Sequence, residues 1–375
     1  MTRRKRTTVI VLVTVAALLM IAGVAWAAGM FPDVAENDTH FDAIEWAAEN
    51  GVVNGYANGN FGPYDPILRG QAATMFQNYD EYLKSTMDGT STCSDCHNDT
   101  TLLTGKRTAW SESLHGTGEA FGRGTSASCA GCHSGGSFSA MVAAGQSPNE
   151  VTAGDPNPTR QDCRACHQIH ETYTGADWAL ETTAPVELFA VEGATFNGGK
   201  GNLCVNCHQP RRGFPAAVNG TITGITSHWG PHHGPQSAMM LGVAGAGAEG
   251  TPSTHYLIVG DTCVGCHLGP NDGHSFEPVE AVCQTCHPDA DGFDVNGVQT
   301  EVQARLDVIG AALVDLGLLS SNDVDGHPTV TEAPEAQAIA LYNWIYIAHE
   351  DKSLGVHNPP YTDALLTAAE EALGL

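Results

Sequence analysis

The chain has little positive charge. Its 375 residues include 16 Lys and Arg against 42 Asp and Glu, which gives a formal net charge of −26 at pH 7. Nucleic-acid-binding proteins need clustered Lys and Arg, so the composition excludes nucleic acid as a partner. The acidic excess favours a solvated, soluble surface. A second interpretation, an acidic face that attracts cationic partners or metal ions, stays open.

No cysteine lies outside one repeated motif, because all 12 cysteines belong to six copies of Cys-X-X-Cys-His. This motif is typical of c-type haem attachment: two thiols bond to the haem vinyl groups, and the next histidine ligates the iron. The cysteines predicted to bind six covalent haems c are Cys93, Cys96, Cys129, Cys132, Cys163, Cys166, Cys204, Cys207, Cys263, Cys266, Cys283 and Cys286. The motif histidines predicted to ligate iron are His97, His133, His167, His208, His267 and His287.

Three other uses of paired cysteines fit the pattern poorly. Zinc sites also use Cys-X-X-Cys, but zinc chemistry does not require histidine at the next position six times. Disulfide scaffolds are short and dense in cysteine, whereas these pairs are spread from Cys93 to Cys286. A thioredoxin-like redox pair is expected once in a domain. Covalent haem therefore remains the interpretation that explains every cysteine.

One long apolar run, Val9–Val24, lies near the N-terminus between four basic residues at positions 3–6 and Ala25-Trp26-Ala27. This order predicts a signal peptide over residues 1–28. The run is nearly long enough to span a bilayer, so an uncleaved anchor stays open. Cleavage would leave 12 basic against 42 acidic residues, a charge of −30. Export agrees with c-type haem and predicts a secreted protein at the cell wall, at the cell surface or in the extracellular space.

Residues 29–85 contain no cysteine and predict a small helical module. Ile44, Ala47 and Ala48, followed by Gly51, indicate a short helix with a glycine cap. A second helix is expected over Arg69–Lys84, with Ala73, Phe76 and Tyr79 or Tyr82 on one stripe. The motifs that precede it are Phe31-Pro32-Asp33-Val34, Gly51-Val52-Val53-Asn54-Gly55-Tyr56 and Asn58-Gly59-Asn60-Phe61-Gly62-Pro63.

This order of motifs resembles one S-layer homology (SLH) module. The resemblance implies binding to cell-wall polysaccharide. Such modules commonly occur as three copies in a cluster, and only one copy is visible in this sequence. Three protomers completing a cluster, or a docking role for the module, therefore stay open as alternatives.

Residues 93–295 predict a hexahaem cytochrome c domain that is rich in Gly and Pro and has little helical periodicity. Residues 296–375 predict its helical C-terminal part, which contributes a distal haem ligand. Val302, Leu306 and Ile309 follow Thr300, a threonine able to cap the helix, and further helices are expected after Pro334 and after Pro359-Pro360. The expected fold class is mostly α and irregular: a haem-packed multihaem domain, a small α-helical SLH module and a helical C-terminal cap.

The sequence contains enough histidines to supply two ligands to each of the six irons. Of the 17 histidines, six belong to the motifs and His40 belongs to the N-terminal module, which leaves ten candidates for six distal positions. An iron with two histidine ligands has no vacancy for substrate, so its work is electron transfer, whereas an open iron indicates catalysis. Ligation by Met141, Met239 or Met240 is an alternative that spare histidines make unnecessary.

The contexts of several histidines resemble distal-ligand contexts in extracellular multihaem cytochromes, including filament-forming ones. The best parallels are the segment Pro231–Gly242 and Gly355-Val356-His357-Asn358-Pro359. The resemblance implies these distal ligands: His115, His170, His232, His255, His274 and His357. His233 competes with His232, His349 is expected in the core, and His327 in a loop.

The predicted function is electron transport without catalytic residues, between the cell envelope and extracellular acceptors. Expected partners are other cytochromes or redox proteins, metal oxides or electrodes, and wall polysaccharide; a homo-oligomeric filament rests on the resemblance alone. The alternative is a multihaem reductase of nitrite, hydroxylamine or a sulfur oxyanion. Nitrite-reducing members of that group carry Cys-X-X-Cys-Lys at the catalytic haem, and this sequence has no such motif.

Overall fold

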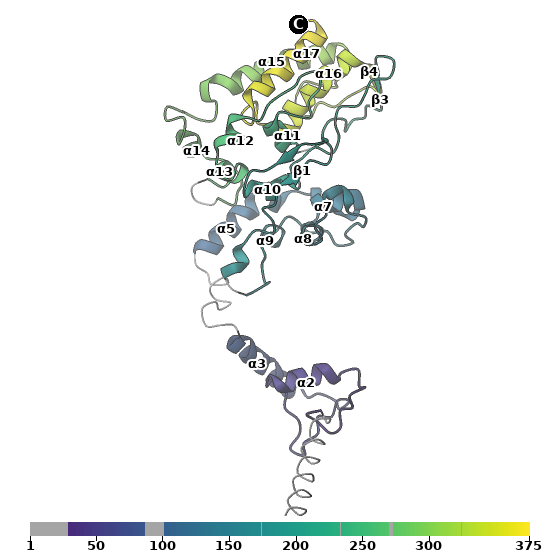
Figure 1. Cartoon of the computed structure of the whole chain (residues 1–375), viewed down its shortest axis with the longest axis vertical. Helices are drawn as coiled ribbons and strands as arrows, with labels where there is room; N and C mark the ends of the chain where they lie inside the picture. Colours follow the sequence, from purple (N-terminus) through teal and green to yellow (C-terminus); the bar gives the residue numbers. More distant parts are fainter. Residues whose placement is uncertain (1–28, 87–100, 174, 233, 270–272, 324) are drawn as a thin grey trace, which may run out of the picture. The chain divides into compact units, whose positions relative to one another are not determined.

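The computed structural model describes residues 29–86, 101–173, 175–232, 234–269, 273–323 and 325–375 (Figure 1). The chain divides into two compact units, one ending at Cys96 and one running from His97 to Leu375. The predicted signal peptide and the first motif (Cys93, Cys96 and His97) lie outside the described residues. Within those residues, no helix combines the length and the apolar character needed to cross a membrane.

The first unit contains two helices, α2 (Phe41–Glu49) and α3 (Arg69–Thr86). The prediction of a glycine cap is confirmed: Gly51 has a φ of 71° just beyond α2, and its N–H donates to the Ala48 carbonyl. Glycine accepts this left-handed conformation without steric cost. The stripe predicted on the second helix is largely exposed, with Phe76 74% accessible. The small core consists of Phe31, Val34, Ile44, Val52 and Val53.

In the second unit, residues 101–284 form short helices joined by irregular chain (Figure 1). A two-residue strand, β1 (Val186–Glu187), pairs antiparallel with β2 (Thr195–Phe196). The mostly α and irregular fold class is confirmed. The α-helices of this region are α5 (Thr101–Glu112), α6 (Leu114–Thr117), α7 (Ala127–His133), α8 (Gly135–Ala143), α9 (Cys163–Cys166), α10 (Gly201–Val205), α11 (Gln236–Leu241), α12 (Thr254–Ile258), α13 (Cys263–His267) and α14 (Glu280–Gln284).

The chain then forms α15 (Val298–Asp315), α16 (Glu335–Ile345) and α17 (Pro359–Leu373), which lie side by side (Figure 1). A π-helical turn, Tyr346–Asp351, continues α16. The cap predicted for α15 is wrong: the helix begins at Val298 after Gly297, and Thr300 lies inside it. The Asp294 carboxylate accepts the N–H groups of Gln299 and Thr300 and satisfies these first-turn donors instead.

The C-terminal helices share one hydrophobic core with the haem-motif region. Strand β3 (Thr221–Thr223) pairs antiparallel with β4 (Glu332–Pro334), placing Ile222 opposite Ala333. The core residues from both parts include Ile222, Ile225, Trp229, Met239, Leu306, Ile309, Leu313, Leu341, Tyr342, Leu365 and Leu366. Packing in this core therefore fixes the chain before and after the fifth and sixth motifs.

Candidate haem-binding sites

Each described motif lies on or beside one short helix. The cysteines of α7, Cys129 and Cys132, are three residues apart on one helical turn, as are Cys163 and Cys166 at the ends of α9. Residues at this spacing lie on the same side of a helix, so both sulfurs can reach one porphyrin edge. The ten described cysteines are all free thiols, which leaves them available for thioether bonds.

The structure pairs five motif histidines with five of the predicted distal histidines. Two imidazoles bound to opposite faces of one iron have ring centres about 6 Å apart, because a metal–imidazole nitrogen bond is about 2.0 Å long. The observed ring-centre distances are 6.3 Å for His133 and His232, 6.3 Å for His167 and His274, 6.2 Å for His208 and His115, 6.3 Å for His267 and His357, and 6.4 Å for His287 and His255. The described residues therefore fit bis-histidine haem at five motifs.

The sixth predicted distal histidine is His170, and the remaining motif histidine, His97, lies outside the described residues. One carboxylate accepts several hydrogen bonds from the segment that contains His170. The Asp177 carboxylate accepts the N–H groups of His170, Thr172 and Tyr173 and the Thr172 hydroxyl. These contacts lower the pKa of Asp177, with the Thr172 hydroxyl the largest cause. They also hold His170 at a φ of 68°, a conformation that non-glycine residues rarely adopt.

Of the two competing histidines, His232 lies within the described residues. The His232 ring faces the His133 ring, and its backbone has a φ of 83°. His233 lies outside the described residues. Strained non-glycine residues cluster at functional sites, and His232 combines strain with a motif partner.

Several rings in these pairs are oriented by a contact at Nδ1. His167, His267 and His255 have Nδ1 at 2.8, 2.9 and 2.7 Å from the carbonyl oxygens of Trp178, Phe276 and Val356, respectively. Such contacts select the tautomer with the proton on Nδ1 and leave Nε2 free to bind a metal.

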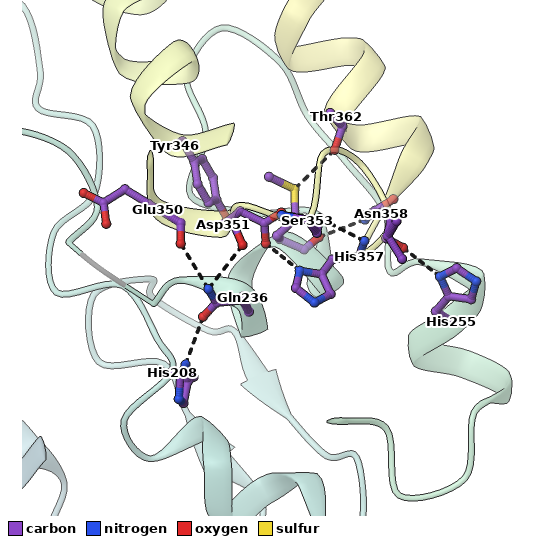
Figure 2. A network of polar contacts seen from close by, with 12 residues as sticks. His208, Gln236, His255, Tyr346, Glu350, Asp351, Ser353, His357, Asn358 and Thr362 are labelled. Carbon is purple, nitrogen blue, oxygen red and sulfur yellow. Dashed lines mark hydrogen bonds and ion pairs between the residues drawn. The ribbon is translucent and has the colours of Figure 1, made fainter. Parts of the chain in front are cut away.

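Two further rings use side-chain oxygens (Figure 2). His208 Nδ1 lies 3.1 Å from Gln236 Oε1, and His357 Nδ1 lies 2.7 Å from Asp351 Oδ1. No local sequence signal indicates these partners, since Gln236 lies 28 residues from His208 along the chain and Asp351 is the last residue of a π-helical turn. Sequence reasoning therefore found these ligand candidates but missed the side chains that orient them.

Burial keeps several of these imidazoles neutral, which a metal ligand requires. Burial lowers the pKa of His115 to about 4 and also lowers the pKa values of His208 and His267. His357 differs: burial opposes its charged form, but the charge and hydrogen bond of Asp351 raise its pKa overall. His357 is therefore the ring in this set with a charged partner at Nδ1.

Cysteines of different motifs lie close together. Cys132 and Cys207 are near enough that their contact lowers the pKa of Cys132 and raises that of Cys207. The same holds for Cys263, whose pKa falls to about 7, and Cys204, whose pKa rises. The attachment edges of the second, fourth and fifth motifs are therefore neighbours.

The methionines offered as alternative ligands lie in cores. Met141 packs in a cluster with Phe138, and Met239 is fully buried and accepts the Thr362 hydroxyl at 3.7 Å. The remaining described histidines of the second unit, His228, His327 and His349, lie near one another, with ring centres 6.4 Å apart for His228 and His327 and 6.3 Å apart for His327 and His349. Among the described residues, no group of three His, Cys, Asp or Glu is arranged to hold a metal ion.

Comparisons with known proteins agree with both resemblances. Residues 31–73 match the model of the S-layer homology domain, and residues 76–179 match that of cytochrome c7 and related cytochromes c. Among solved structures, the outer cell wall cytochrome OcwA is similar, with 24% identity over 72% of this chain and 50% of that chain and a TM-score of 0.47. This chain thus spans half the length of that cytochrome. No curated protein matches.

The two family matches confirm the prediction of an S-layer homology module followed by a multihaem cytochrome c. The cytochrome match implies covalently bound haem c, and the S-layer homology match supports a cell-wall or cell-surface location.

Proposed function

We propose that this multihaem cytochrome is an exported conduit that moves electrons between the cell envelope and an extracellular acceptor through six bis-histidine haems c. The observation that carries the proposal is the set of five histidine pairs with ring centres 6.2–6.4 Å apart. Haem supplies one-electron redox chemistry. The chain's own residues attach it, fill both axial positions and exclude a substrate from the iron.

The proposed ligand pairs, motif histidine first, are His97 with His170, His133 with His232, His167 with His274, His208 with His115, His267 with His357, and His287 with His255. The first pair is proposed by elimination, because the other five distal histidines already face a motif partner.

A continuous electron path is supported by the contacts between attachment sites. Cys132 lies against Cys207, and Cys204 lies against Cys263. The fifth and sixth motifs are also neighbours: burial raises the pKa of Cys266 first, and the nearby Cys283 raises it further. Covalent attachment at such neighbouring positions brings porphyrin edges close, and tunnelling rates fall steeply with edge-to-edge distance.

The ligand set can be tested by substituting a single distal histidine in the full-length protein. His115→Ala should convert one haem from low spin to high spin, seen by low-temperature electron paramagnetic resonance and by carbon monoxide binding after reduction. His40→Ala, in the N-terminal module, is the matched control and should change neither signal. Intact mass should show six haem additions in the wild-type protein. A substantial high-spin signal in the wild-type protein would instead favour the reductase.

The location and partners form a separate part of the proposal. We infer that the single S-layer homology module binds cell-wall polysaccharide, alone or after three protomers combine, and that the acceptors are other cytochromes, metal oxides or electrodes. The exposed apolar side chains of the module, Ile67, Leu68 and Phe76, supply surface through which protomers could combine. Sedimentation of the protein with purified cell walls tests binding, with a chain lacking residues 29–86 as control. Cryo-electron microscopy of the purified protein tests whether head-to-tail contacts build a filament.

A further inference from the structure

One short segment, residues 350–357, is linked to the histidines of three proposed haems: it contains His357, contacts His255 directly and reaches His208 through Gln236 (Figure 2). Gln236 Nε2 donates to the carbonyls of Glu350 and Asp351 at 3.0 and 3.3 Å, while its Oε1 lies 3.1 Å from His208 Nδ1. The Val356 carbonyl is 2.7 Å from His255 Nδ1. The same segment contains His357 itself. It begins in the π-helical turn, a rare geometry that is frequent at functional sites.

Asp351 is the charged group of this segment that faces a ligand ring. Its side chain is 0% exposed, and Oδ1 lies 2.7 Å from His357 Nδ1. Its other oxygen accepts hydrogen bonds from the backbone N–H and the hydroxyl of Ser353. A buried carboxylate is tolerated when it is hydrogen-bonded in this way. The structure thus fixes a negative charge directly behind one proposed iron ligand.

The described Nδ1 contacts of the other paired histidines go to neutral oxygens. These are the carbonyls behind His167, His267 and His255 and the amide oxygen of Gln236 behind His208. A carboxylate attracts the Nδ1 proton more strongly than a neutral oxygen does, which increases the electron density at Nε2. A more basic axial ligand stabilises the oxidised iron and lowers the reduction potential.

We propose that Asp351 gives the haem attached at Cys263 and Cys266 a lower reduction potential than the haems of the fourth and sixth motifs. The proposal rests on the ligation of that haem by His267 and His357 under the proposed function. Cys263 lies beside Cys204 of the fourth motif, and Cys266 lies near Cys283 of the sixth. The fifth haem is therefore an interior step of the path. Asp351 then sets the difference in reduction potential between this haem and its neighbours, which an electron must overcome to pass.

The test is Asp351→Asn in the full-length, haem-loaded protein, titrated by spectroelectrochemistry. One of the six reduction potentials should rise, by about tenfold in its equilibrium constant or about 59 mV for one electron, while the other five stay in place. Asp323→Asn is the matched control. The Asp323 carboxylate accepts from Ser321 and from the Asp325 N–H, and neither contact involves a paired histidine. This control should move no potential.

A second variant adds a carboxylate behind a ligand histidine instead of removing one. Gln236→Glu places a carboxylate behind His208 and should lower the potential of the fourth haem. The inference is overturned if neither variant moves a single potential in its expected direction, or if Asp351→Asn moves several together, as loosened packing would.

His357→Ala separates this failure from failure of the proposed function. A new high-spin haem shows that His357 is a ligand, so unchanged potentials in Asp351→Asn then refute only the tuning role. An unchanged low-spin spectrum refutes the ligand assignment itself.

Discussion

Residues 101–284 and residues 298–373 belong to one unit but are built differently. In the first region the helices that bear motif cysteines have between four and seven residues, and the described cysteines are exposed or half-buried. In the second, α15 and α17 have 18 and 15 residues and bury Leu306, Ile309 and Leu365 completely. Long helices form where side chains supply the core. Short helices suffice where a large apolar cofactor is expected to supply it.

The largest effect should follow haem removal. Protein produced in cells without the c-type attachment machinery should lose ordered structure in residues 101–284 outside the core shared with the C-terminal helices, because the histidine pairs and cysteine clusters have nothing to enclose. Limited proteolysis followed by mass spectrometry should locate the first cuts there. The S-layer homology module, residues 29–86, contains no motif and is the internal control. An identical cleavage pattern with and without haem would contradict this view of the two regions.

A smaller loss is expected from the side-chain core. Leu341→Ala removes a fully buried side chain from α16 and should lower the free energy of unfolding by about 2–5 kcal/mol. Val308→Ala on α15, where the side chain is 54% exposed, should change it by about 0.5 kcal/mol or less. Denaturant unfolding of the haem-loaded protein, followed by circular dichroism, measures both. Equal effects would show that α16 is not held by this core.

The smallest expected loss of stability concerns the hydrogen bonds that join residues 101–284 to the C-terminal helices. Asn343 donates to the carbonyls of Ala246 and Leu365 and accepts the Ala246 N–H, all in buried surroundings. Asn343→Ala leaves these backbone groups unsatisfied and should lower the free energy of unfolding by about 1–3 kcal/mol. Gln303→Ala, which removes an exposed contact with Asp307, is the control. The same denaturant series separates the two variants.

The sequence was most informative about features that depend on the spacing of residues close together along the chain. Cys-X-X-Cys-His identifies the attachment residues without any knowledge of the fold, and a count of histidines predicts two ligands for each iron. The apolar spacing of Leu306, Ile309 and Leu313 also predicts their helix, because one helical face repeats regularly. These features depend on neighbours along the chain.

Features that depend on distant packing could not be predicted in this way. The Asp351 contact needs a π-helical turn that no sequence periodicity indicates, and Gln236 reaches His208 only because the 350–351 carbonyls hold its amide. The Thr300 cap was predicted from residue type, but Asp294 lies in the capping position in space. In each case several side chains satisfy the same rule, and tertiary structure selects one.

His357 lies far beyond Cys263 and Cys266 along the sequence, which has a consequence for biogenesis. A protein that is exported N-terminus first delivers the fifth motif, at Cys263 and Cys266, before its proposed second ligand emerges. Under the proposed function, a haem attached at this motif would lack its second histidine until the segment that contains His357 has emerged and folded. A chain that stops after Lys352 should then mature with one haem able to bind carbon monoxide.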